Sequence, residues 1–140
     1  MPTITRKQYE SKKAMTPEGW EYDVQTAVIW GRHELTRRVY LDEFHFVAAT
    51  ICYKDEPVPG NRWATTGRQI PVIHVQYWTL NPKKNLSTSS GLGSDYMPIG
   101  EPEPRKNYKS LCKYAAEITE ERIMDIYTAN RKKCLDPVLI

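Results

Sequence analysis

The sequence predicts an α+β domain in which helices cover one face of an antiparallel sheet of four or five strands. Between residues 20 and 80, apolar and polar residues alternate in several runs, and a period of two is typical of strands. The two ends of the chain instead carry the signals that begin helices. A length of 140 residues suits one domain with its own core, so we expect residues 1–140 to form a single domain.

The N-terminal segment predicts a short helix over residues 6–14. Thr5 can cap this helix, and Gln8 three residues later can complete a capping box. The sequence TPEG at residues 16–19 follows, and a proline and a glycine so close together end a helix.

Five runs in the middle of the chain predict strands. The clearest is WEYDVQTAVIW at residues 20–30, where large apolar residues alternate with polar ones. Residues 35–41 predict a half-buried strand, and FHFVAATICY at 44–53 is apolar on both faces, as in a central strand. A shorter strand at 62–69 then precedes IPVIHVQYWTL at 70–80. Because turn residues separate these runs, we expect an antiparallel meander.

The strand at residues 70–80 has two unlike faces. Its alternation places Ile73, Val75 and Tyr77 on one face and His74, Gln76 and Trp78 on the other. We expect the first set to lie in the core and the second to lie on the opposite face of the sheet.

Residues 81–107 are rich in Pro, Ser, Gly and Lys and predict a long mobile loop. The sequence leaves open whether such a loop is functional or disordered. Two helices should follow, one over residues 108–117 and one that begins after Thr119, which can act as its cap. The second helix should pack on the sheet through Ile123, Ile126 and Tyr127.

Several chemistries lack their sequence signals. The chain has no glycine-rich phosphate loop, no serine-nucleophile elbow and no zinc-ligand spacing, so we expect no catalytic residues, no metal and no cofactor. An enzyme with an unrecognised histidine site remains a third alternative, built from His45 and His74 with Asp23 or Asp42.

The location expected from the sequence is cytoplasmic, without contact with a membrane. No apolar run approaches the roughly 18 residues of a membrane span, and the first twenty residues lack a signal-peptide pattern. The three cysteines are an odd number without paired spacing, which favours reduced thiols over a disulfide framework.

The leading functional hypothesis is a small non-enzymatic protein that binds a macromolecular partner, expected to be a protein. Tyr and Trp far outnumber Phe, and rings with a polar group are common in interfaces. The candidate binding residues are Arg38, Tyr40, His74, Gln76 and Trp78 on the polar sheet face, together with Trp63 and Arg68.

The alternative is a nucleic-acid-binding module that uses the basic C-terminal helices and exposed tryptophans. Residues 105–133 carry eight basic and four acidic side chains, among them Lys109, Lys113, Arg131, Lys132 and Lys133.

Overall fold

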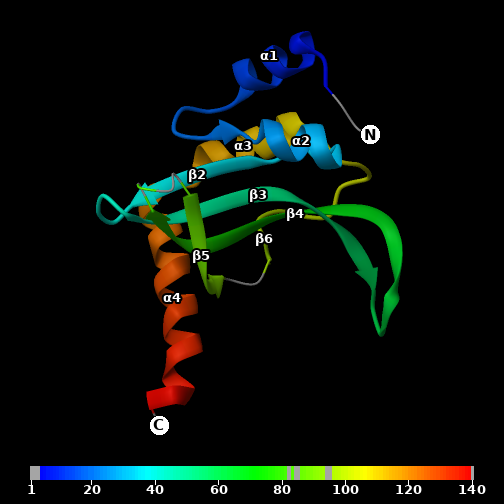
Figure 1. Cartoon of the computed structure of the whole chain (residues 1–140). Helices are drawn as coiled ribbons and strands as arrows, with labels where there is room; N and C mark the ends of the chain where they lie inside the picture. The colour runs from blue at the N-terminus through cyan, green and yellow to red at the C-terminus, as the bar shows by residue number, and fades with distance from the viewer. Residues whose placement is uncertain (1–3, 82, 84–85, 94–95, 140) are drawn as a thin grey trace.

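An antiparallel sheet forms the centre of the protein, and its main strands lie side by side in chain order (Figure 1). The computed structural model describes the backbone of residues 4–81, 83, 86–93 and 96–139, and the side chains of these residues except 62, 86–93 and 130–139. The sheet order is β1 (Glu21–Tyr22), β2 (Leu35–Tyr40), β3 (His45–Val58), β4 (Asn61–Asn81) and β5 (Leu86–Gly93), and β6 (Met97–Pro98) also pairs with β4. The predicted α+β class is confirmed.

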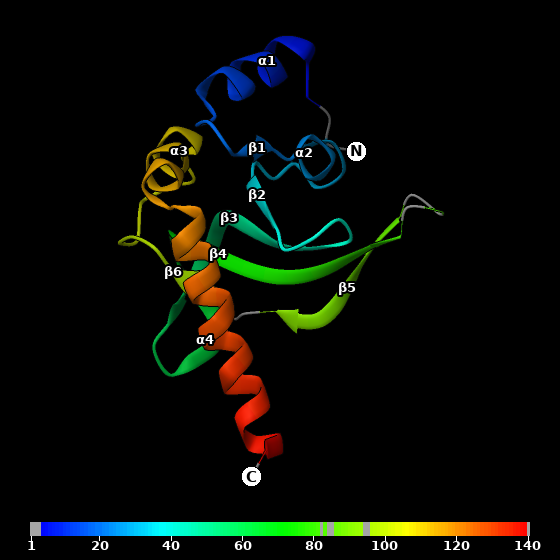
Figure 2. The same ribbon diagram turned by 90° about the vertical axis from the view of Figure 1, so that its left-hand side faces the viewer.

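The described part of the chain forms four helices: α1 (Arg6–Met15), α2 (Val24–Trp30), α3 (Tyr108–Glu117) and α4 (Glu120–Leu139). In Figures 1 and 2, α2 and α3 lie between α1 and the sheet, while α4 runs past the sheet and points away from it. The predicted N-terminal and C-terminal helices are confirmed. The capping box of α1 is formed, because the Thr5 hydroxyl accepts from Gln8 N at 3.1 Å and Thr5 N donates to Gln8 Oε1 at 2.9 Å.

The long strand predicted at residues 20–30 is wrong, because most of this segment is helix α2 and only Glu21–Tyr22 forms a strand. Asp23 caps the helix by accepting from Thr26 N at 3.0 Å and from the Thr26 hydroxyl at 2.8 Å. Gly31 ends it with a φ of 69°, a left-handed conformation that suits glycine. Local capping therefore overrides the strand preference of the alternating apolar residues.

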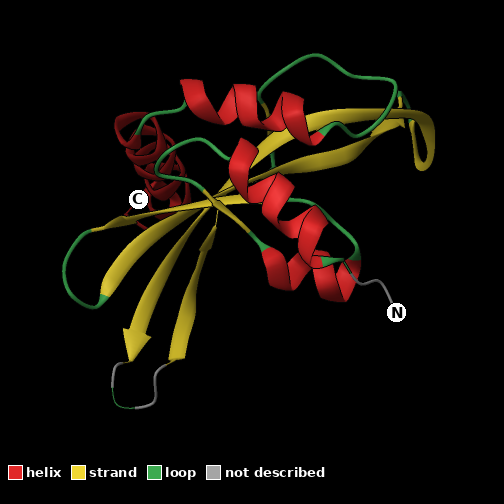
Figure 3. Ribbon diagram, turned by 90° about the horizontal axis from the view of Figure 1, so that it is seen from above, coloured by secondary structure: helices red, strands yellow, loops and turns green. Residues whose placement is uncertain are grey.

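The strands predicted at 62–69 and 70–80 form one strand, β4, of 21 residues. It pairs with β3 across a turn at residues 59–60, where Gly60 has a φ of 77°. This β3–β4 hairpin extends beyond the body of the protein in Figures 1 and 3. The hairpin tip and the β2–β3 turn consequently lie at opposite ends of the sheet.

The segment 81–107 contains strands β5 and β6, so the expectation of an irregular loop is wrong for those residues. β5 pairs with the end of β4, β6 pairs with Val72 and Ile73, and Glu103 forms an isolated bridge with Gln69. The backbone N–H and C=O groups along the edge of β4 need hydrogen-bond partners. A pairing segment supplies them with its own backbone, whatever its side chains are. Mobility of the segment stays a prediction.

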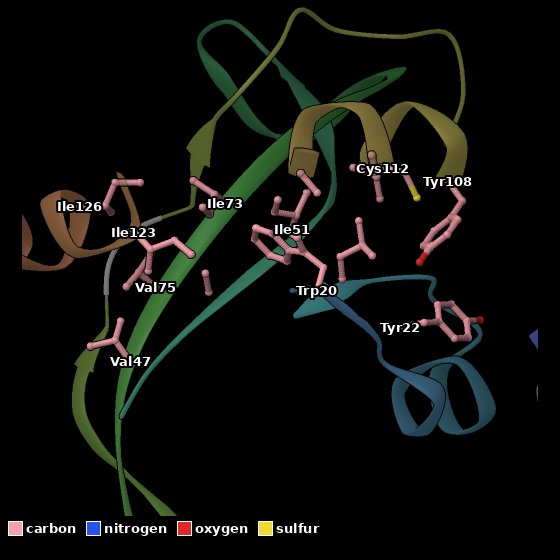
Figure 4. Close-up of a cluster of buried hydrophobic side chains, with 14 of the residues drawn as sticks. Trp20, Tyr22, Val47, Ile51, Ile73, Val75, Tyr108, Cys112, Ile123 and Ile126 are labelled. Carbon is pink, nitrogen blue, oxygen red and sulfur yellow. The ribbon is translucent and has the colours of Figure 1, made fainter. Parts of the chain in front are cut away.

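The hydrophobic core lies between the sheet and the helices, as Figure 4 shows. The buried set includes Val47, Ala49 and Ile51 of β3, Ile73 and Val75 of β4, Leu111 and Ala115 of α3, and Ile123, Ile126 and Tyr127 of α4. The helix-facing residues predicted for β4 and α4 are therefore confirmed. The opposite side of the sheet, which we call the outer face, carries the residues of even number in β2, in the first part of β3 and in the 72–78 part of β4.

Candidate functional site

The outer face brings together most of the side chains expected to bind a partner. Arg38 lies opposite Ala48, which in turn lies opposite Gln76, and Tyr40, Phe46 and Trp78 are aligned in the same way across three strands. His74 lies beside Thr50 one row further along the sheet. Five of the seven predicted binding residues thus share one face: Arg38, Tyr40, His74, Gln76 and Trp78.

Tyr40, Phe46 and Trp78 form a continuous aromatic row. The ring centroids of Tyr40 and Phe46 are 5.2 Å apart, and those of Phe46 and Trp78 are 6.4 Å apart with planes at 6°. The guanidinium carbon of Arg38 lies 4.6 Å from the centre of the Phe46 ring, and Arg38 Nη1 donates to the Tyr40 hydroxyl at 3.3 Å. Phe46 is only 2% exposed, whereas Tyr40 is 54% exposed. The row therefore has a buried centre and an accessible rim.

The β2–β3 turn at residues 41–44 adds exposed apolar side chains beside the aromatic row. Leu41 and Phe44 are 46% and 42% exposed. Asp42 holds this turn, because its Oδ1 accepts from Phe44 N at 2.7 Å and from His45 N at 2.9 Å. The pKa of the Asp42 carboxyl is lowered, chiefly by the hydrogen bond from Phe44 N and next by a hydrogen bond with the His45 imidazole. Accessible apolar groups therefore continue from the row onto a shaped turn.

His74 occupies the same face but is partly covered. Its ring stacks on Tyr96 with centroids 4.7 Å apart, and the Lys54 ammonium lies 4.0 Å from the centre of the Tyr96 ring. The histidine therefore belongs to a second cluster beyond Gln76, formed by His74, Tyr96 and Lys54.

A joint site of His45 and His74 is wrong, because these histidines lie on opposite faces of the sheet. His45 stacks on Tyr77, which packs against the core, and its Nδ1 lies 2.9 Å from Asp42 Oδ1. Asp23 is engaged as the cap of α2. Period-two geometry explains the separation, since residues of odd and even number in paired strands point to different faces. Among the described residues, no group of three metal-ligating side chains is present.

Trp63 and Arg68 lie near the tip of the β3–β4 hairpin, away from the aromatic row. Trp63 is 84% exposed, and Arg68 pairs with Glu56 through an Nη2–Oε1 distance of 2.7 Å. Sequence reasoning separated these two residues from residues 70–80 by an expected strand break. In the structure one long strand connects them, which places Trp63 and Trp78 toward opposite ends of β4.

Sequence reasoning missed Phe46, the centre of the aromatic row. The run at residues 44–53 is apolar on both faces, so its composition gives no reason to assign Phe46 to the outer face. The pairing of Phe46 with Trp78 would have revealed it, but the sequence alone does not give the register.

The basic side chains proposed for nucleic acid are only partly described. Lys109 and Lys113 are exposed on α3, and the side chains of residues 131–133 lie outside the described part of the chain.

None of the described helices is long and apolar enough to cross a membrane. Comparisons of the chain with protein-family models, with curated proteins and with solved structures found no match.

Proposed function

We propose that this protein is a non-enzymatic binding protein that contacts another protein through the outer face of its sheet. The observation that supports the proposal is the aromatic row, with Arg38 laid over Phe46 and with Tyr40, Leu41 and Phe44 accessible around it. Tyr, Trp and Arg carry much of the binding energy in protein interfaces, and they act best when surrounding contacts exclude water. The row combines these residue types with a rigid sheet beneath them.

The rigidity of this surface matters for affinity. Tyr40 packs against the buried Phe46 ring and accepts a hydrogen bond from Arg38, so its side chain loses little freedom when a partner covers it. The turn that carries Leu41 and Phe44 is held by two backbone hydrogen bonds to Asp42. A partner would therefore meet a preformed surface.

The proposal is tested by isolating the partner with the tagged protein from its host and measuring its affinity for variants. Tyr40→Ala should weaken the complex by about 30-fold or more, the equivalent of about 2 kcal/mol for a hot-spot residue. Trp63→Ala is the matched control, because it truncates another exposed aromatic residue at the other end of the hairpin. Weakening by Trp63→Ala and not by Tyr40→Ala would move the binding surface to the hairpin tip.

A nucleic-acid-binding function is the second candidate, and the exposed pair Lys109 and Lys113 on α3 favours it. Neither lysine forms a salt bridge within the described part of the chain. Binding through phosphate contacts should weaken steeply as salt rises. Fluorescence anisotropy with labelled single-stranded DNA at low and physiological salt measures this, and a complex that does not respond to salt would eliminate the candidate.

A cytoplasmic location is part of the proposal. Cys52 and Cys112 are both buried free thiols, and unpaired buried cysteines are compatible with a reducing compartment.

A further inference from the structure

A hollow lies beyond the aromatic row, at the place where the chain before β2 separates from β3, and it borders the cluster of His74, Tyr96 and Lys54. β2 and β3 are paired from Leu35 and Ile51 onward, whereas residues 31–34 leave the edge of β3. A cavity of about 350 Å³ occupies this opening, between residues 31–34, the middle of β3, the N-terminal helix and the start of α3. This volume is in the range of small-molecule sites, which span roughly 300–1,000 Å³.

Four cationic side chains from four different segments line the cavity. They are Lys12 of α1, Arg32 of the loop before β2, Lys54 of β3 and Lys106 of the loop before α3. The acidic side chains in its wall are Glu34 and Asp55, which leaves a balance of +2. Convergence of charges from distant parts of the sequence distinguishes this hollow from an ordinary solvated helix surface.

Little of this positive charge is neutralised within the described part of the chain. Arg32 Nε lies 3.9 Å from Glu34 Oε1, at the outer limit of an ion pair, and Asp55 accepts from Gln69 Nε2 at 2.6 Å. Lys12 and Lys54 lie over the rings of Tyr108 and Tyr96, at 5.1 and 4.0 Å from the ring centres, and form no salt bridge with any described residue.

The cations of the cavity affect the pKa values of two side chains in its wall, Glu34 and His33. Arg32, Lys54 and Lys106 all act on Glu34, although burial is the largest effect and raises its pKa. Burial, followed by the charges of Lys12 and Lys106, lowers the pKa of His33 and so favours the neutral imidazole. Its Nδ1 is hydrogen-bonded to the Tyr22 hydroxyl. The cavity is therefore a region of positive potential, and the pKa of His33 is sensitive to the charges in it.

We propose that this basic pocket binds a small organic anion whose charged group is a phosphate or a carboxylate. Ammonium and guanidinium groups are the usual partners of both anions, and the pocket offers several of them without committed acidic partners. The pocket volume of about 350 Å³ suits a small molecule. The site is distinct from the aromatic row, so the binding function proposed above can fail without affecting this inference.

The test is an NMR titration of the full-length protein with inorganic phosphate and, separately, with succinate, at ionic strength held constant with NaCl. The imidazole signals of His33 should shift in a saturable way at concentrations up to about 20 mM, where millimolar sites fill. The pKa of His33 should rise when the anion is bound, since the anion offsets Lys12 and Lys106, whereas the signals of His45 should not move. Saturation by phosphate alone assigns a phosphate ester, and saturation by succinate alone assigns a carboxylate.

Paired variants locate the binding. Lys54→Gln with Lys106→Gln removes two cations of the pocket and should weaken anion binding by about tenfold or more, because charge-assisted contacts are lost. Lys109→Gln with Lys113→Gln removes the same charge from the exposed side of α3 and should leave the affinity unchanged. The proposal is overturned if neither anion gives a saturable shift of His33, or if both double variants bind equally well.

Discussion

Phe46 is almost completely buried although it lies on the face of the sheet opposite the helices. Its cover comes from the rings of Tyr40 and Trp78 and from Arg38, all of them side chains of neighbouring strands. The outer face is thus a small core of its own with an exposed rim. Both rings shield Phe46, but Tyr40 is 54% exposed whereas Trp78 is partly buried, so at the scale of single residues the two should differ.

Three truncations separate the two faces by their effect on stability. Val75→Ala should lower the free energy of unfolding by about 1.5–3 kcal/mol, since Val75 is 1% exposed in the main core. Tyr40→Ala should cost about 1 kcal/mol or less, because more than half of this side chain is exposed. Trp78→Ala should fall between them, because it removes a larger and more buried ring than Tyr40→Ala does. Urea unfolding measures all three, and a Tyr40 variant as unstable as the Val75 variant would show that the faces are assigned incorrectly.

The Cys52 thiol should make the folded protein less stable at alkaline pH. Burial, and next the charge of Glu34, raise the pKa of its thiol to about 11, whereas an unfolded cysteine titrates near about 8.5. Between these values the unfolded chain has lost the proton that the folded protein keeps, so stability is full below about pH 8.5 and falls as the pH rises toward 11.

Thermal melts from about pH 8 to about pH 9, below the pKa of about 10 of ordinary tyrosines, measure the onset of this loss. The melting temperature of the wild type should decrease with pH, and Cys52→Ala should decrease less steeply. Equal slopes for the two proteins would contradict the assigned role of Cys52.

At the scale of elements, α2 shows why the alternating pattern of residues 20–30 predicted a strand where a helix forms. Residues 20–30 alternate as a strand would, but seven of them have a capping aspartate before them and a glycine that can adopt positive φ after them. These local hydrogen bonds satisfy both ends of a short helix, and they outweigh β-propensity, which depends strongly on context. Helices α1, α3 and α4 each have a capping side chain at the N-terminus, from Thr5, Asn107 and Thr119, and no competing alternation, so their positions could be predicted.

Substitution of Asp23 tests this explanation. Asp23→Ala should lower the free energy of unfolding by about 0.5–2 kcal/mol, because it removes the cap that binds Thr26 N and the Thr26 hydroxyl. Gln25→Ala is the control, since this exposed residue lies inside the helix and alanine favours helix. Chemical unfolding of both variants gives the comparison. If Asp23→Ala leaves stability unchanged, the capped helix does not stabilise this segment.

At the scale of the whole molecule, the sheet carries two surfaces of different chemistry. Its outer face presents aromatic rings and a guanidinium, and the edge of β3 opens into a basic pocket. The alternation of residues 70–80 was enough to predict which side of β4 faces the helices. The aromatic row needed the register of three strands, and the pocket needed four segments that are distant in sequence. Neither relation is encoded in local periodicity, so sequence reasoning could not find them.

Hydrogen exchange of the protein, free and bound to its purified partner, tests the outer-face proposal most directly. A partner seated on the aromatic row should slow exchange in residues 38–48 and 74–80, which contain the row and its turn, because it excludes water from that part of the sheet. Exchange at the hairpin tip, residues 57–66, should be the same in both states. Slower exchange that is confined to the hairpin tip or to α4, with residues 38–48 unchanged, would contradict the proposal.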